Sequence, residues 1–102
     1  MCGISGILDT NRSADWLAVN AQRMADAMRL RGPDGDGVWA DGEAGIALSH
    51  RRLSIIDLSD DGAQPMQSAS GRYQISFNGE VYNFLELRRE LQARRAEFRG
   101  TG

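Results

Sequence analysis

The chain has 102 residues, enough for one domain, because a chain of this size buries roughly 60–70% of the surface that its unfolded form exposes. The formal net charge is −2 and no apolar run approaches the roughly 20 residues that span a bilayer, so neither a nucleic acid nor a membrane is expected as a partner. The single cysteine excludes an internal disulfide and is typical of a reducing compartment, which predicts a cytoplasmic protein.

The first third of the sequence predicts a strand followed by a helix. Residues 3–8 read as a short strand at the N-terminus. A helix is expected over residues 14–30, because apolar residues recur there at spacings of three and four, and Ser13 is placed to cap it. The density of glycine and proline in residues 31–37 predicts a loop.

Several strands are expected in the middle of the chain. Residues 38–40 and 44–49 form a predicted pair, joined by the Asp41-Gly42 hairpin signal. Residues 53–58 are apolar enough to be largely buried. In residues 72–77, aromatic and aliphatic side chains alternate with polar ones, which predicts a strand with one buried face.

A second helix is expected near the end of the chain. Asn83, with Glu86 three residues later, is a suitable N-terminal cap. The order of elements therefore mixes helices with antiparallel hairpins. Because the chain stops at residues 101–102 in a segment that reads as a loop, we expect a truncated domain.

Cys2 is the first residue that could carry chemistry. Initiator methionine is normally removed before a residue this small, which would leave Cys2 with a free α-amino group. Such a group has a pKa of about 7.7–8.0 and can accept the thiol proton, directly or through water. Gly3 and Gly6 in the strand behind it would let a substrate approach the backbone. A chance cysteine at this position is the alternative when the residue is considered alone.

Five short motifs, in order along the chain, carry a resemblance to a known family. They are Met1-Cys2-Gly3-Ile4-Ser5-Gly6-Ile7, Arg31-Gly32-Pro33-Asp34, the segment 50–57 with its Arg-Leu-Ser-Ile core, Gly62-Ala63-Gln64-Pro65-Met66, and Phe77-Asn78-Gly79-Glu80-Val81-Tyr82-Asn83. Over nearly its whole length the chain resembles the class II (N-terminal nucleophile) glutamine amidotransferases, and within them the glutamine-hydrolysing asparagine synthases of the B type.

The resemblance implies an α+β fold, the four-layer αββα sandwich of N-terminal nucleophile hydrolases. Residues 1–102 would be the N-terminal part of its glutaminase domain. It also implies hydrolysis of the side-chain amide of L-glutamine through a thioester on Cys2, with release of ammonia. Asn78 and Gly79 would donate hydrogen bonds to the developing oxyanion, completing the catalytic set. A type I′ hairpin turn is the alternative role for Asn78-Gly79.

The resemblance also implies a glutamine pocket. Arg52 would bind the substrate carboxylate, for which a planar guanidinium is the natural partner, while Arg51 is expected at the surface. The expected glutamine-binding residues are Arg52, Leu53, Ser54, Ile55, Ile56, Asn78, Gly79 and Glu80. Glu80 has the alternative role of an acid at a helix start. In the family, an acidic residue beyond Gly102 binds the substrate amino group, so we expect weak glutamine binding by this chain alone.

The remaining parts of the reaction would lie in a further, ATP-dependent synthetase domain that is absent here. By resemblance, that domain would use ATP and Mg²⁺ to activate aspartate, which ammonia would convert to asparagine. No cofactor and no metal are expected in this segment, since one cysteine and one histidine cannot form a zinc cluster. The sequence does not determine the oligomeric state, and a homodimer is one possibility. It also leaves open an amidotransferase with a sugar or cell-surface precursor as acceptor, and a non-catalytic interaction module.

His50 is the only histidine. A Cys–His dyad is one interpretation, but an N-terminal cysteine carries its own base. We therefore expect His50 to make a structural hydrogen bond.

Overall fold

The computed structural model describes residues 2–54 and 62–98. Its elements are β1 (Gly3–Leu8), α1 (Ala14–Ala27), β2 (Gly35–Asp41), β3 (Ile46–Arg52), β4 (Met66–Gln67), β5 (Gln74–Ile75) and α2 (Phe84–Ala93). Strands pair only in antiparallel fashion among these residues and are mixed with the two helices. The α+β class expected from the sequence is confirmed.

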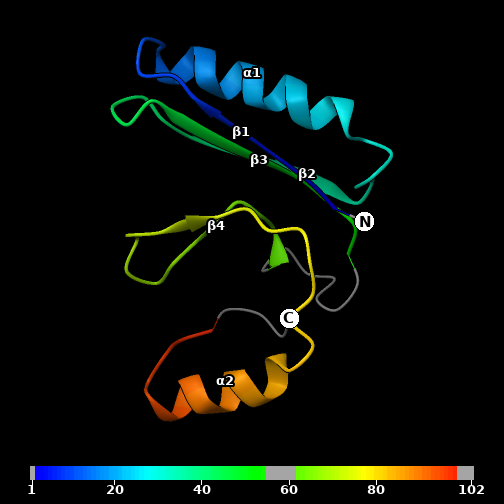
Figure 1. Cartoon of the computed structure of the whole chain (residues 1–102), viewed down its shortest axis with the longest axis vertical. Coiled ribbons are helices and arrows are strands. Elements are labelled where there is room, and N and C mark those ends of the chain that lie inside the picture. The colour runs from blue at the N-terminus through cyan, green and yellow to red at the C-terminus, as the bar shows by residue number, and fades with distance from the viewer. Residues whose placement is uncertain (1, 55–61, 99–102) are drawn as a thin grey trace.

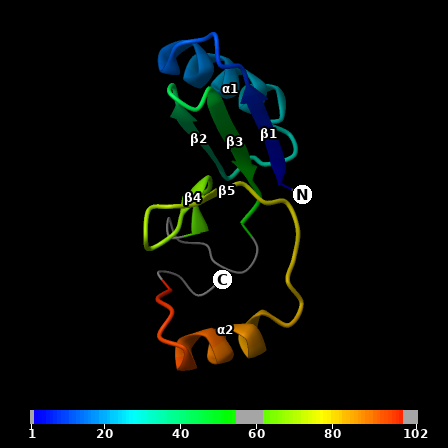
Figure 2. The same cartoon turned by 60° about the vertical axis from the view of Figure 1, so that its left-hand side comes forward.

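The larger sheet has three strands in the order β1-β3-β2, with β3 in the centre, as Figure 2 shows. In its register, Gly3 lies opposite Arg51 and Gly35 lies opposite Arg52. The start of β1, the end of β3 and the start of β2 therefore meet at one end of the sheet. Residues from three separate parts of the sequence are gathered there.

Helix α1 covers one face of this sheet (Figure 1). Leu17 and Ala21 of the helix are fully buried with Ala47 of β3, and Ile7 and Val38 pack against them. The helix forms because its apolar residues return to one side every three or four positions, and burial of that side stabilises it. This small cluster is the core of the part of the chain that the structure describes.

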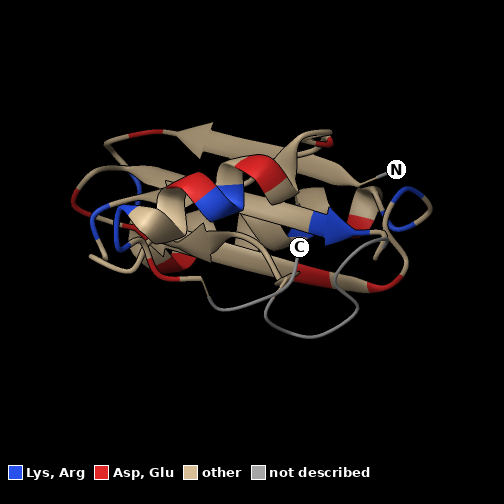
Figure 3. Cartoon of the chain, turned by 90° about the horizontal axis from the view of Figure 1, so that it is seen from below, with Lys and Arg blue, Asp and Glu red and all other residues tan. Residues whose placement is uncertain are grey.

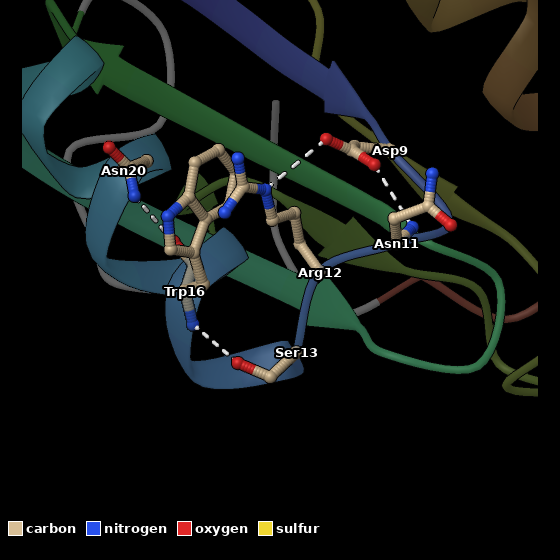
Figure 4. A network of polar contacts seen from close by, with 6 residues as sticks. All are labelled: Asp9, Asn11, Arg12, Ser13, Trp16 and Asn20. Carbon is tan, nitrogen blue, oxygen red and sulfur yellow. Dashed lines mark hydrogen bonds and ion pairs between the residues drawn. The ribbon is translucent and has the colours of Figure 1, made fainter.

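The helix start is defined by a local polar network (Figure 4). The Ser13 hydroxyl accepts a hydrogen bond from the Trp16 backbone N–H at 3.1 Å, which confirms the predicted cap. In the preceding turn, Asp9 accepts from the backbone N–H of Asn11 at 2.9 Å and pairs with Arg12 at 3.6 Å. The Arg12 guanidinium also stacks 4.4 Å from the Trp16 ring centroid.

The β4–β5 hairpin lies on the other side of the large sheet, and α2 lies beyond it (Figure 1). No residue of α2 is buried. Asn83 stands at its N-terminus but makes no side-chain capping bond, so the predicted cap is wrong in that detail. Within the described ranges, neither helix is long and apolar enough to cross a bilayer.

Two predicted boundaries in the first half change. Helix α1 ends at Ala27 rather than at residue 30. Residues 35–37, expected in a loop, join β2 because they pair with the end of β3. The turn between β2 and β3 is also longer than a two-residue hairpin. In it, Asp41 accepts from the N–H groups of Glu43 and Ala44 at 3.0 and 3.2 Å, and Gly45 adopts a φ of 69°.

The strand predicted over residues 72–77 shrinks to β5, and its expected buried face is wrong. Tyr73, Ile75 and Phe77 are 63%, 53% and 42% exposed. Alternation alone does not supply a layer to pack against, and this face has none among the described residues. Most of the predicted apolar segment 53–58 lies outside the described residues.

Candidate functional site

Cys2 lies immediately before β1, and its sulfur contacts the backbone of Leu53. The Leu53 N–H donates to Sγ at 3.3 Å, and Sγ lies 3.7 Å from the Leu53 carbonyl oxygen, which can accept the thiol proton. This contact follows from strand direction, since antiparallel pairing places the start of β1 beside the end of β3. The structure thus brings the predicted nucleophile to the predicted glutamine-binding segment.

The Arg31–Asp34 loop holds both of these segments. Arg31 Nε donates to the Cys2 carbonyl at 3.3 Å. The Asp34 backbone N–H donates to the Arg52 carbonyl at 2.9 Å, and the Asp34 carboxylate accepts from the Ser54 N–H at 2.8 Å. Sequence reasoning used this loop as a family motif and gave Asp34 no role. An aspartate in such a turn usually bonds to backbone N–H groups about two residues on, so no local pattern signalled its bond to Ser54.

Gly32 fits this loop against the backbone of β3. A Cβ at this position would collide with the Arg51 carbonyl group. The Gly32 carbonyl in turn accepts from Arg51 Nε at 2.8 Å. Arg51 is only 8% exposed and lies 3.8 Å from the Asp36 carboxylate, so the prediction of a surface arginine is wrong.

Arg52 differs from its neighbour in orientation. Successive side chains on a strand face opposite sides, so Arg52 shares a face of β3 with His50 rather than with Arg51. Figure 3 shows the basic tip of β3 near the N-terminus. Arg52 is half-buried, and its face of the sheet is the one on which the chain around Phe77 lies.

The segment before Asn78 is fastened to that face by hydrogen bonds. His50 Nε2 donates to the Phe77 carbonyl at 3.1 Å, and the Phe77 N–H donates to the Gln64 side-chain oxygen at 2.6 Å. No strand follows Asn78-Gly79 in the described part of the chain, since the chain leads on to α2. This connection is therefore not the hairpin turn that was the alternative interpretation.

The predicted site residues are brought together only in part. Leu53 contacts Cys2, and Arg52 and Ser54 flank that contact. Asn78, Gly79 and Glu80 lie on the connection between β5 and α2, and among the described residues no hydrogen bond joins them to Cys2. Ile55 and Ile56 lie outside the described residues. Within the same ranges, no three acidic, histidine or cysteine side chains gather in a group that could hold a metal ion.

His50 is 1% exposed, and one of its ring nitrogens bonds to the Phe77 carbonyl. Because a carbonyl oxygen only accepts, the bond to Phe77 requires a proton on Nε2. Nδ1 is buried and has no partner in the described structure. Burial is the main cause that lowers the pKa of His50, the Phe77 carbonyl opposes it, and the positive charge of Arg52 adds to the lowering. The expected structural hydrogen bond is confirmed.

The sequence is similar to known proteins over its whole length. The family model described as a glutamine amidotransferase domain matches residues 1–102. The chain is 39% identical over 103 residues to glutamine-hydrolyzing asparagine synthetase 3 of Bacillus subtilis (strain 168), covering 99% of this chain and 16% of the relative. It is 40% identical over 90 residues to glutamine-hydrolyzing asparagine synthetase B of Escherichia coli (strain K12), covering 88% of this chain and 16% of the relative.

A third relative, a probable glutamine-hydrolyzing asparagine synthetase of Dictyostelium discoideum, is 37% identical over 93 residues, covering 91% of this chain and 16% of the relative. The chain thus spans only a small part of the length of the curated relatives that it matches. The match to the family model covers the chain from end to end. On that evidence the chain belongs to the glutamine amidotransferase domain family.

Proposed function

We propose that this chain is the N-terminal part of the glutaminase domain of a glutamine-hydrolysing asparagine synthetase. The observation that carries the proposal is the contact between Cys2 Sγ and the Leu53 backbone, which joins the nucleophile to the segment expected to bind glutamine. Membership of the amidotransferase family supports glutamine as the substrate. The names of the relatives support asparagine as the final product.

The reaction would begin at Cys2 after removal of Met1. The freed α-amino group would take the thiol proton, and the thiolate would attack the side-chain amide carbon of glutamine. Collapse of the tetrahedral intermediate would break the C–N bond, with the proton returning to the nitrogen as ammonia leaves. Water would then hydrolyse the thioester to give glutamate. The Leu53 N–H, 3.3 Å from Sγ, would hold the sulfur in place for attack.

Asn78 and Gly79 would stabilise the oxyanion in this proposal. The side-chain amide of Asn78 is a neutral donor, and Gly79, which has no side chain of its own, would add its backbone N–H. Loss of one such donor typically costs about 10²- to 10³-fold in rate. The bonds that fasten Phe77 to the sheet support a fixed position for the residues that follow it.

Glutamine itself would be bound by Arg52 and the chain that follows it. The Arg52 guanidinium would pair with the substrate carboxylate in a two-bond geometry. The Ser54 N–H is already taken by Asp34, so Ser54 would offer its carbonyl and hydroxyl. Leu53, Ile55 and Ile56 would line the pocket with backbone groups, and Glu80 would close it with a carboxylate.

The proposal extends to the complete fold. Figure 1 shows α1, the large sheet, the β4–β5 hairpin and α2 in sequence from one end of the molecule to the other. This order supports the four-layer αββα sandwich of N-terminal nucleophile hydrolases, in which further strands would widen both sheets. In that larger domain, Cys2 would keep its contacts with Leu53 and Arg31.

In the whole protein, ammonia would pass to an ATP-dependent domain outside this chain. That domain would use Mg²⁺ and ATP to activate aspartate, and attack by ammonia would give asparagine in the cytoplasm. Replacement of Cys2 should separate the two activities. We expect Cys2→Ala in the full-length gene product to abolish glutamine hydrolysis while ammonia-dependent asparagine synthesis persists. Simultaneous loss of both activities in a folded protein would contradict this division.

The first test is intact mass spectrometry of the full-length gene product with and without 6-diazo-5-oxo-L-norleucine. We expect loss of Met1 and one covalent adduct that maps to Cys2. The Cys2→Ala variant is the matched control and should take no label. A retained Met1, or a folded protein that takes no label, would overturn the assignment of the nucleophile.

A further inference from the structure

We propose that His50 and Gln64 are positioning residues that hold the main chain of Phe77 and thereby set the orientation of the oxyanion donors Asn78 and Gly79. The inference rests on the proposed glutaminase function. It assigns a role to two side chains that do not touch the substrate in that proposal. Its basis is the pair of hydrogen bonds that enclose Phe77.

Both polar groups of the Phe77 main chain are bound by side chains from elsewhere in the sequence. The Phe77 N–H donates to Gln64 Oε1 at 2.6 Å, and the Phe77 carbonyl accepts from His50 Nε2 at 3.1 Å. The preceding residue adds a third bond, from the Ser76 hydroxyl to the Ser49 carbonyl at 3.0 Å. Phe77 lies two residues beyond the end of β5, so no strand ladder satisfies these groups.

The bond from His50 acts directly on the peptide unit that leads into Asn78. A peptide bond is planar and trans, so the carbonyl of Phe77 and the N–H of Asn78 point in opposite directions within one rigid plane. When His50 holds the carbonyl, it also sets the direction of the Asn78 N–H and the position of the Asn78 Cα. The fixed position of the Asn78 Cα then limits where the Asn78 side chain and the backbone of Gly79 can lie.

Both anchors are tied to the sheet that carries Cys2. His50 lies in β3 opposite Ile4 of β1 and Gly37 of β2, and Ile4 is two residues from Cys2. The backbone carbonyl of Gln64 packs against Gly37 so closely that a Cβ on Gly37 would collide with it. The β1-β3-β2 sheet thus fixes the positions of both the nucleophile and the oxyanion donors. Catalysis by preorganised donors requires such fixed positions.

A positioning role predicts a specific change in kinetics. In the full-length gene product, His50→Leu removes the donor to Phe77, while His50→Gln keeps an N–H donor on a side chain of similar reach. We expect His50→Leu to lower kcat for glutamine hydrolysis by about 10- to 100-fold, because misplaced donors act on the transition state. KM for glutamine should change by less than about threefold. His50→Gln should recover most of the lost kcat.

A second readout separates the oxyanion donors from the nucleophile. Alkylation of Cys2 by iodoacetamide needs the thiolate but no carbonyl oxyanion. Its rate should therefore be the same in wild type and in His50→Leu. Ser13→Ala, which removes the N-terminal cap of α1, is the control for a general loss of stability and should leave kcat unchanged.

Gln64→Leu tests the other anchor and remains informative if His50→Leu does not fold. It should show the same fall in kcat with little change in KM. A folded His50→Leu or Gln64→Leu protein with kcat within about twofold of wild type would overturn the inference, as would a parallel loss of Cys2 alkylation. Failure of the proposed function would look different, because wild type itself would then lack glutamine hydrolysis.

Discussion

At the scale of single residues, His50 combines deep burial with one satisfied and one unsatisfied ring nitrogen. Protonation of His50 would place a positive charge in a buried site, where the positive charge of Arg52 would repel it. The lowered pKa of His50 reflects first its burial and then this repulsion, with the Phe77 carbonyl acting in the opposite direction. The neutral ring is therefore the form that the folded chain favours.

This lowered pKa predicts a pH dependence of stability. The unfolded chain binds a proton at His50 near the ordinary value of 6.5, whereas the folded chain binds it only at lower pH. Between these two values the unfolded state holds more protons, so the free energy of unfolding should fall as the pH drops below 6.5. Above that value the contribution is fully present.

Denaturant midpoints compared between about pH 5 and pH 8 would measure this effect. His50→Gln is the control, because its side chain does not titrate. The stability difference between wild type and this variant should shift against wild type as the pH falls. A difference that stays constant across the range would show that His50 titrates normally in the folded protein.

At the scale of elements, the end of the β1-β3-β2 sheet is braced by the Arg31–Asp34 loop. The loop bonds to the Cys2 carbonyl, to the Arg52 carbonyl and to the Ser54 N–H. These groups lie at the end of β3 or just outside the ends of β1 and β3, where the hydrogen bonds between strands stop. The loop therefore holds Cys2, Arg52 and Ser54 in place beyond the point where strand pairing ends.

Gly32 lies where the Arg31–Asp34 loop approaches the backbone of β3 too closely for a side chain. We expect Gly32→Ala to destabilise the protein by about 1–3 kcal/mol, because its Cβ would collide with the Arg51 carbonyl and push the loop off β3. Gly35→Ala is the matched control, since its Cβ would meet only the Arg52 side chain at 3.9 Å, an ordinary contact. Thermal unfolding of both variants would measure the difference, and equal midpoints would contradict the close approach.

The elements also show how far local patterns could predict the fold. Helix α1 and its Ser13 cap were predictable, because helical spacing and capping depend on residues within one or two turns of each other. The extension of β2 back to Gly35 was not, because it comes from pairing with Arg52. The exposed side chains around β5 were missed for the same reason, since alternation in sequence does not say whether a second layer is present.

At the scale of the whole molecule, the half that contains β4, β5 and α2 exposes apolar side chains on several elements. Tyr73, Ile75 and Leu85 are 63%, 53% and 57% exposed, and Leu91 is 44% exposed. No residue of α2 is buried. Apolar surface of this kind usually marks a face that is covered by something else.

The proposal of a larger glutaminase domain predicts what covers it. The 102-residue chain alone should bind 8-anilinonaphthalene-1-sulfonate with a strong rise in fluorescence. The full-length gene product should give a much smaller rise per molecule, because the rest of the domain would pack on this face. Equal fluorescence from the two proteins would mean that α2 stays exposed in the complete protein.

By itself, the sequence determined the family, the candidate nucleophile Cys2 and the segments expected around glutamine. These conclusions depend on short motifs and local periodicity, which a single stretch of chain carries in full. It also limited His50 to a structural or a dyad role without naming its partner.

Only the tertiary structure decided which of these segments meet. Cys2 reaches Leu53 across 51 positions of sequence, His50 reaches Phe77 across 27, and Asp34 reaches Ser54 across 20. Each of these contacts depends on strand direction and register, which are set by the packing of the whole sheet rather than by neighbours in the chain. For this reason, only the folded chain shows that Arg51 is buried rather than exposed. It also shows for the first time that His50 and Gln64 hold the main chain of Phe77.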